Sequence, residues 1–208
     1  MERLEVFAGW LVGPGVERGL LGPREVERIW PRHVVNCALL APRLPTSCSV
    51  CDLGSGAGLP GVVLAVLHPG LQVTLLEPLL RRADFLREVV ADLGLGRVEV
   101  VRARAEDYRR TTPAHDAVVA RAVAPLPRLV SWAVPLLRPG GTLWALKGES
   151  AAAELDQARQ ELSRAGVVDA DVLTLTEGGN VTHAVRVVRP APPGDGSTPH
   201  STGHGTEG

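Results

Sequence analysis

The sequence predicts an α/β fold in which a mostly parallel β-sheet carries helices on both faces. From residue 49 onward, short apolar runs alternate with longer amphipathic segments, and a glycine-rich turn follows the first run. Strands that alternate with helices along a chain form parallel sheets that are covered on both sides. A chain of 208 residues is long enough to build one such unit around a substantial core.

The first 47 residues predict a helical cap that precedes the sheet. Apolar residues recur at helical spacing over 2–12, 23–30 and 31–41, and proline occupies the first position of the last two segments. We therefore divide the chain into a cap over 1–47 and an α/β domain over 48–189.

Strands and helices alternate through the α/β domain. Apolar runs bounded by glycine, proline or charged residues mark the strands, and segments with an apolar stripe mark the helices. The strands are expected at 49–54, 71–77, 97–102, 115–121 and 141–146, and the helices at 60–67, 79–93, 106–110, 126–137 and 150–165.

The C-terminal part changes character. Residues 171–176 and 182–188 flank Glu177-Gly178-Gly179-Asn180, a hairpin signal that predicts an antiparallel strand pair. Residues 190–208 are mostly Pro, Gly, Ser, Thr and His, so we expect this tail to be disordered.

A nucleoside-binding turn is the most informative feature of the chain. It is the run Asp52-Leu53-Gly54-Ser55-Gly56-Ala57-Gly58-Leu59-Pro60-Gly61, between the first strand and its helix. Glycine allows a positive φ and the close approach of a ligand, and the helix that follows offers unpaired N–H groups.

Two ligands fit such a turn. Gly56 to Gly61 spell the G-x-G-x-x-G pattern of dinucleotide sites, which would indicate a nicotinamide-dependent oxidoreductase. A carboxylate at Asp52 that faces the ligand instead suits the cationic, amino-acid-bearing end of S-adenosylmethionine. A simpler alternative is a tight turn in which Asp52 only caps the helix.

The next two strands end in further candidates for nucleoside contacts. Glu77 follows the second strand about 25 residues after Asp52, near the ~20-residue interval typical of ribose-binding acids. We expect it to accept hydrogen bonds from both ribose hydroxyls. After the third strand, Ala105 would offer backbone groups to an adenine, and Glu106 would accept from its exocyclic amine.

In these motifs the chain resembles the RsmG or GidB family of small-subunit ribosomal RNA guanine-N7 methyltransferases. The resemblance spans roughly residues 25–188, and the usual His-x-x-Asp-Ser of the family is replaced here by His33-Val34-Val35-Asn36-Cys37. It rests on Arg32-His33-Val34 with Asn36, the turn 52–61, Leu75-Leu76-Glu77, Arg81-Arg82, Phe85-Leu86, Ala105-Glu106, Arg121-Ala122 and Ala145-Leu146-Lys147-Gly148.

The resemblance implies a class I S-adenosylmethionine-dependent methyltransferase (Rossmann-like) fold. It also implies methylation of guanine N7 in the decoding-region loop of 16S ribosomal RNA, as free RNA, in the small subunit or in an assembly intermediate. Cofactor contacts are implied for Gly54, Leu59, Glu77, Ala105, Glu106 and Arg121, and the turn itself adds Asp52, Gly56 and Gly58.

Three side chains are candidates for a catalytic role. Arg121 ends the fourth strand, at the edge where α/β sheets bind ligands, and would contact cofactor or substrate unless it pairs with Glu106. Lys147, the only lysine beside 21 arginines, could meet a phosphate or a guanine oxygen. His33 would face the same cleft, or else serve as a structural residue of its helix.

No general base is expected, because guanine N7 carries a free lone pair. The fourth strand is followed by Ala122-Val123-Ala124-Pro125, with neither the Asn/Asp-Pro-Pro-Tyr run of exocyclic-amine methyltransferases nor a cysteine. Alignment and desolvation would then supply the catalysis. The alternatives are a class I methyltransferase acting on a protein or small molecule and a non-catalytic S-adenosylmethionine-binding regulatory module.

Charge and apolar content restrict the partners and the location. With a formal net charge of −1, the chain would need a local basic patch to bind RNA, and the candidates are Arg24, Arg28, Arg32, Arg81, Arg82, Arg109 and Arg110. No apolar run approaches the roughly 20 residues that span a bilayer, so we expect a cytoplasmic protein, and we expect a monomer.

The three cysteines predict no metal site. Cys48-Ser49-Val50-Cys51, His33 and Cys37 could be imagined as zinc ligands. However, this C-x-x-C enters a strand, whose successive side chains point in opposite directions, whereas a redox pair belongs at a helix N-terminus.

Overall fold

The computed structural model describes residues 1–109 and 114–191, and they form a seven-stranded sheet with strand order β3-β2-β1-β4-β5-β7-β6. The strands β1 to β5 are parallel to one another, and β7 runs antiparallel to both β5 and β6. The predicted fold and its C-terminal antiparallel pair are both confirmed. The strands are β1 (Ser49–Leu53), β2 (Gln72–Leu76), β3 (Val98–Val101), β4 (His115–Arg121), β5 (Leu137–Lys147), β6 (Ala170–Glu177) and β7 (Asn180–Val188).

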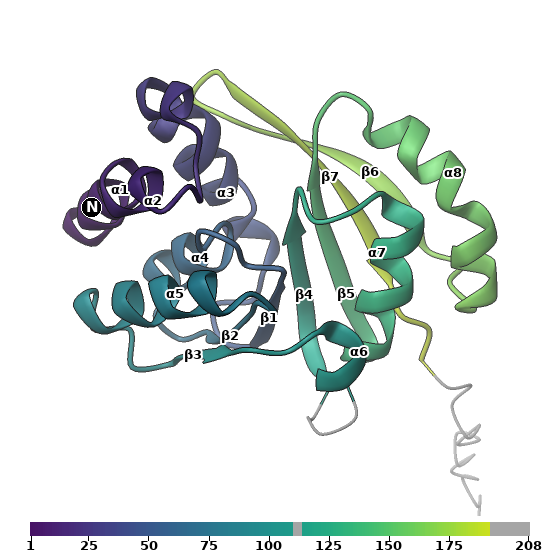
Figure 1. Ribbon diagram of the computed structural model, residues 1–208. Coiled ribbons are helices and arrows are strands. Elements are labelled where there is room, and N and C mark those ends of the chain that lie inside the picture. The colour runs from purple at the N-terminus through teal and green to yellow at the C-terminus, as the bar shows by residue number, and fades with distance from the viewer. Residues whose placement is uncertain (110–113, 192–208) are drawn as a thin grey trace, which may run out of the picture.

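Helices cover both faces of the sheet (Figure 1), as expected for strands that are apolar on both sides. One core cluster joins one face to α1 (Glu2–Val12), α4 (Gly61–Leu67) and α5 (Leu80–Asp92). A second cluster joins the other face to α6, α7 and α8. These helices are α6 (Ala105–Tyr108), α7 (Leu126–Ala133) and α8 (Ala151–Arg164).

The N-terminal segment is helical, but it is less regular than the sequence predicts. The two expected helices over 23–41 are replaced by a 3₁₀ helix, a π-helical segment that contains Pro31, and two very short helices. Proline lacks an N–H and disfavours α-helical geometry at the residue before it, which accounts for the break. The elements between α1 and β1 are α2 (Pro14–Glu17), 3₁₀ Pro23–Arg28, π Ile29–Val35, α3 (Asn36–Ala38) and 3₁₀ Ala41–Arg43.

A second difference lies between α7 and β5. The helix predicted to reach residue 137 ends at Ala133, and a 3₁₀ turn around Pro135 leads directly into β5. The start of β5 contains Gly141, where a Cβ would lie 2.9–3.1 Å from three backbone carbonyl oxygens. Only glycine allows this close approach, and the pairing of β4 with β5 shifts register at the same place.

The division into a cap over 1–47 and a domain over 48–189 remains a proposal. The apolar residues of α1 belong to the same core cluster as those of α4 and α5. The tail from residue 192 onward lies outside the described residues. Within the described ranges, none of the helices combines the length and the apolar character that a membrane crossing requires.

Candidate functional site

Glycines hold the turn after β1 in the left-handed backbone region. The φ angle is +70° at Gly54, +57° at Gly56 and +93° at Gly58, where a residue with a Cβ would be strained. The N–H groups of Gly54 and Ser55 donate to the carbonyl of Leu76, at 2.8 and 3.2 Å. These bonds fasten the turn to the end of β2, so that the carboxyl ends of β1 and β2 form one surface.

Asp52 lies beneath the turn rather than in a cavity. The residue is 1% exposed, and its Oδ2 accepts a hydrogen bond of 2.9 Å from the N–H of Gly61, the first residue of α4. Oδ1 has no hydrogen-bond partner among the described residues. Burial raises the pKa of Asp52 to about 7, although the bond from Gly61 lowers it in part. The sequence-based expectation that this carboxylate faces the ligand is therefore wrong, and its placement matches the helix-cap alternative.

Glu77 is also buried, but it borders a cavity. One carboxylate oxygen accepts from the N–H of Gly56 and the other from the N–H of Leu79, both at 2.9 Å. A carboxylate oxygen can accept a second hydrogen bond, so the group is held in place and still offers acceptor capacity. The glycine turn and the acid after β2 are thus a single hydrogen-bonded unit.

The first cavity has a volume of about 460 Å³ and lies at the carboxyl ends of β1, β2 and β4. Gly54 is part of its wall, where a Cβ would lie 3.0 Å from both methyl groups of Val123. On the side of α7, the guanidinium of Arg128 stacks 4.6 Å over the ring of Trp132. The lining also includes Leu53, Leu76, Glu77, Leu79, Arg82, Ala105 and Glu106.

A second cavity of about 420 Å³ lies beside the first, between the N-terminal segment and the ends of β4, β5 and β7. Ala122 lines both cavities. Among the described residues other than glycine, it is the one with a positive φ, +54°. Such backbone strain is concentrated at binding sites, where the surrounding structure maintains it. The second cavity is lined by Glu25, Arg32, His33, Asn36, Arg121, Leu146, Lys147, Gly148, Glu154 and Thr182.

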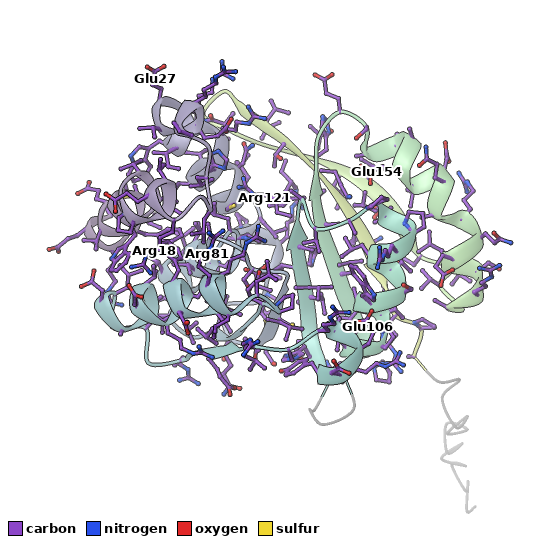
Figure 2. All side chains as sticks on the ribbon, in the orientation of Figure 1. Arg18, Glu27, Arg81, Glu106, Arg121 and Glu154 are labelled. Atoms are coloured by element: carbon purple, nitrogen blue, oxygen red, sulfur yellow. The ribbon has the colours of Figure 1, made fainter. Side chains whose placement is uncertain are left out.

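Arg121, His33 and Glu25 form a hydrogen-bonded chain along this second cavity. Arg121 Nη2 lies 2.6 Å from His33 Nδ1, and His33 Nε2 lies 2.7 Å from Glu25 Oε2. Arg121 also donates to the carbonyl of Arg32, at 3.3 Å. Figure 2 shows Arg121 at the tip of β4, on the side of the N-terminal helices. In the described part of the chain, no ion pair joins Arg121 to Glu106.

Near neutral pH, the hydrogen-bonded series Arg121–His33–Glu25 stays in one protonation state. Burial lowers the pKa of His33 below its usual value, as do the charges of Arg121 and Arg32, and Glu25 offsets part of this effect. The hydrogen bond from His33 lowers the pKa of Glu25. A neutral imidazole therefore lies between a cation and a carboxylate.

Lys147 is paired within the protein. Its Nζ donates to the carbonyl of Ala124 at 2.9 Å and to Glu154 at 2.7 Å, and its side chain is 9% exposed. Burial alone would raise the pKa of Glu154, but the Lys147 ammonium and the N–H of Leu126 together lower it. Lys147 thus ties the loop after β4 to α8, and the described residues leave one of its three N–H groups for another acceptor.

Most of the sequence-predicted residues gather around the two cavities. Gly54, Glu77, Ala105 and Glu106 line the first, and Arg121, Lys147 and His33 line the second. Asp52, Gly56, Gly58 and Leu59 support the turn from outside these walls.

The sequence reasoning missed Glu25, Glu154 and Val123. Exposed-looking acids on helices carry no local signal of their partners, because those partners come from other elements. The basic candidates Arg24, Arg28, Arg81 and Arg109 are exposed, and Arg110 lies outside the described residues.

The cysteines do not form a metal centre in the described part of the chain, where no group of three or more His, Cys, Asp or Glu is suitably placed. Cys37 and Cys51 are fully buried. Burial raises the pKa of the Cys37 thiol to about 12 and that of Cys51 further still. Thiols in this state are inert packing groups.

Comparisons with known proteins assign the chain to a family. The model of the GidB family, described as rRNA small subunit methyltransferase G, matches residues 1–183. The chain belongs to the GidB family. It is 57% identical over 183 residues to "Ribosomal RNA small subunit methyltransferase G" of Thermobifida fusca, covering 88% of this chain and 76% of that protein. A Nocardioides protein of the same name is 55% identical over 190 residues, with coverage of 88% and 74%.

Solved structures show that this GidB family member has the class I methyltransferase fold. A precorrin-6y C5,15-methyltransferase from Geobacter metallireducens matches with a TM-score of 0.55 at 18% identity, over 81% of this chain and 90% of that one. The S-adenosylmethionine-dependent methyltransferase SibL matches with a TM-score of 0.61 at 21% identity, over 80% of this chain and 57% of that one. At these identities the likeness concerns the fold alone.

Proposed function

We propose that this protein transfers a methyl group from S-adenosylmethionine to N7 of a guanine in the decoding-region loop of 16S ribosomal RNA. The observation that carries the proposal is the pair of cavities that meet at Ala122. One has the features of a nucleoside site, and the other is lined by cations. Membership of the GidB family supports small-subunit ribosomal RNA as the substrate.

The residues of the first cavity fit S-adenosylmethionine. Glu77 offers fixed carboxylate oxygens to ribose hydroxyls, and Ala105 and Glu106 border the place for an adenine. Gly54 keeps the wall open where a side chain would narrow it. When bound, the cofactor supplies an electrophilic methyl group on a sulfonium.

The residues of the second cavity would hold the guanine and its phosphates. Arg121 has five N–H donors, of which the described structure engages two, and Lys147 has one donor left. Donors placed against guanine O6 or a phosphate orient the base and leave the N7 lone pair free. The chain then contributes alignment and exclusion of water, effects worth about 7–11 kcal/mol in well-oriented reactions.

Charge balance in the second cavity is consistent with this division of labour. The cations would repel a sulfonium and a methylated, positively charged guanine, so they cannot stabilise the product directly. Glu25 and Glu154 neutralise part of their charge within the cavity. We therefore assign Arg121 and Lys147 to positioning of the RNA, and His33 to positioning of Arg121.

Arginines of this chain would contact the RNA backbone, because the chain has no global basic excess. Arg32 lines the second cavity and the half-buried Arg82 lines the first, and Arg24, Arg28, Arg81 and Arg109 are exposed candidates for the same role. We further propose that the protein acts as a monomer in the cytoplasm, where ribosomal subunits assemble.

The deciding experiment maps N7-methylguanine in small-subunit RNA. RNA from cells with and without the protein is treated with borohydride and aniline, which cleave at N7-methylguanine, and the stops are read by primer extension. One strong stop in the decoding region should disappear on deletion and return when purified protein and S-adenosylmethionine are added to the deficient particles. A stop that is unaffected by deletion would refute the assignment, and cofactor binding without transfer would favour a regulatory module.

A further inference from the structure

We infer that Glu25 is a positioning residue for methyl transfer: through His33 it fixes the guanidinium of Arg121 beside the junction of the two cavities. The inference rests on the proposed function. It concerns a residue from the N-terminal segment that lies 96 positions before Arg121 in the chain and meets it only through the imidazole.

The geometry allows only one tautomer of His33. A guanidinium can only donate, so the 2.6 Å contact from Arg121 Nη2 requires a lone pair on Nδ1. The proton of the neutral imidazole is therefore on Nε2, where it is donated to Glu25 at 2.7 Å. Glu25 thus selects the tautomer that can accept from Arg121.

The hydrogen bonds to His33 and Arg32 also direct the remaining donors of Arg121. One side of the guanidinium is held by His33 and by the carbonyl of Arg32, at 2.6 and 3.3 Å. The other N–H groups of Arg121 have no acceptor among the described residues and are left for one in the second cavity. Because the next residue, Ala122, lines both cavities, a shift of the Arg121 backbone or side chain would misplace the substrate relative to the methyl donor.

The charged groups that face His33 come from three elements. Glu25 lies on the 3₁₀ helix, Arg32 on the π-helical segment that carries His33, and Arg121 on β4. A second proton on His33 would put an N–H against the N–H of Arg121 and break the hydrogen bond between them. Activity should therefore fall on the acid side as His33 becomes protonated.

The test compares Glu25→Gln, Glu25→Ala and His33→Gln with the wild type, in methyl transfer to deficient small-subunit particles between pH 5 and 8.5. In Glu25→Gln the amide oxygen still accepts a hydrogen bond from His33 Nε2, but the negative charge that favours protonated His33 is gone. The acid limb, the fall in methyl-transfer rate at low pH, should therefore move to lower pH by about one unit. Glu25→Ala removes the acceptor, and kcat should fall at least tenfold at every pH with unchanged S-adenosylmethionine affinity. In His33→Gln the new amide can accept from Arg121 and donate to Glu25 without titrating, so the acid limb should flatten.

Glu27→Gln is the matched control, because Glu27 is an exposed acid on the same 3₁₀ helix (Figure 2). Its pH profile should equal that of the wild type. The His33 imidazole titration, followed by NMR without substrate, should show the same downward shift for Glu25→Gln. Identical acid limbs and titrations in the wild type and Glu25→Gln would overturn the inference. A wild type that is inactive on every particle would overturn the proposed function instead, while the titration would still decide the role of Glu25.

Discussion

Asp52 shows how a single buried carboxyl couples the binding turn to protein stability. Its Oδ2 satisfies an N–H at the start of α4, but Oδ1 has no partner among the described residues. A Cβ on Gly61 would lie only 2.6 Å from Oδ2, so the carboxyl is closely confined. Asp52 has no ion pair among the described residues, and the charge of Arg121 lowers its pKa less than burial raises it.

This residue predicts a distinctive pH dependence of stability. In the folded protein burial raises the pKa of Asp52 to about 7, whereas the unfolded carboxyl titrates near its usual pKa of about 4. Between these values the folded state keeps a proton that the unfolded chain has lost, so this contribution to stability falls as the pH rises. The side chain of Asp52→Asn cannot titrate. In urea unfolding from pH 4 to 7.5, the free energy of unfolding of Asp52→Asn should therefore rise relative to that of the wild type by a few kcal/mol. Parallel profiles would show that folding does not raise the pKa of Asp52.

Gly54 predicts a selective loss of cofactor binding. Alanine at φ +70° reduces the free energy of unfolding by about 1 kcal/mol or more. Its Cβ would also lie 3.0 Å from Val123 in the wall of the first cavity, where it would disturb the binding surface. Calorimetry should show S-adenosylmethionine affinity reduced about tenfold or more, since 1.4 kcal/mol is tenfold. Gly94→Ala is the control, because Gly94 has a similar φ of +60° with nothing within 4 Å. Equal effects of the two substitutions on affinity would argue against a site at Gly54.

At the scale of elements, the strands could be predicted closely and the N-terminal helices could not. Each predicted strand from 49 to 121 lies within one or two residues of an observed one, because buried β-branched runs have few alternative structures. The segment 23–41 follows no single helical period, since Pro31 interrupts it and its side chains adapt to β4. The glycine turn was recognisable locally, whereas the partners of Arg121 and Lys147 depend on tertiary packing.

The loop after β4 depends on its attachment to α8 through Lys147. Lys147→Met would leave Glu154, about one-fifth exposed, without its cation and free the carbonyl of Ala124. Losing one partner of a buried ion pair lowers the free energy of unfolding by about 3–5 kcal/mol, and the partial exposure of Glu154 should reduce this loss to about 2 kcal/mol. Urea unfolding measures the loss, and methyl transfer should fall at least tenfold.

A double variant separates the two roles of Lys147. Lys147→Met with Glu154→Gln removes both charges and keeps an acceptor for the N–H of Leu126. Its stability should recover most of the loss, whereas turnover should stay low if the third N–H of Lys147 positions RNA. Recovery of both would assign Lys147 to a purely structural role.

At the scale of the whole molecule, helix α1 packs into the same core as the sheet. α1 and α2 dock on α5, where Trp10 donates to Asp92 at 2.7 Å and Arg18 makes two bonds to Glu88, at 2.9 and 2.7 Å. The apolar side chains of α1 share a core cluster with the sheet. Since the same segment supplies Glu25 and His33 to the second cavity, its docking and the integrity of the site are linked.

This linkage predicts that a cavity in the N-terminal helix destabilises the entire fold. Leu11 is fully buried in the cluster that joins α1 to the sheet, so Leu11→Ala should cost about 2–5 kcal/mol. Leu162→Ala, in the cluster on the opposite face, is the control for an ordinary core truncation. Hydrogen exchange should show peptides from α1 and β4 exposed together in both variants, because a single transition governs them. If Leu11→Ala instead released α1 alone while β4 kept its protection, the N-terminal segment would be a separately folding cap, and the arrangement of Glu25, His33 and Arg121 would have to form by docking rather than with the sheet.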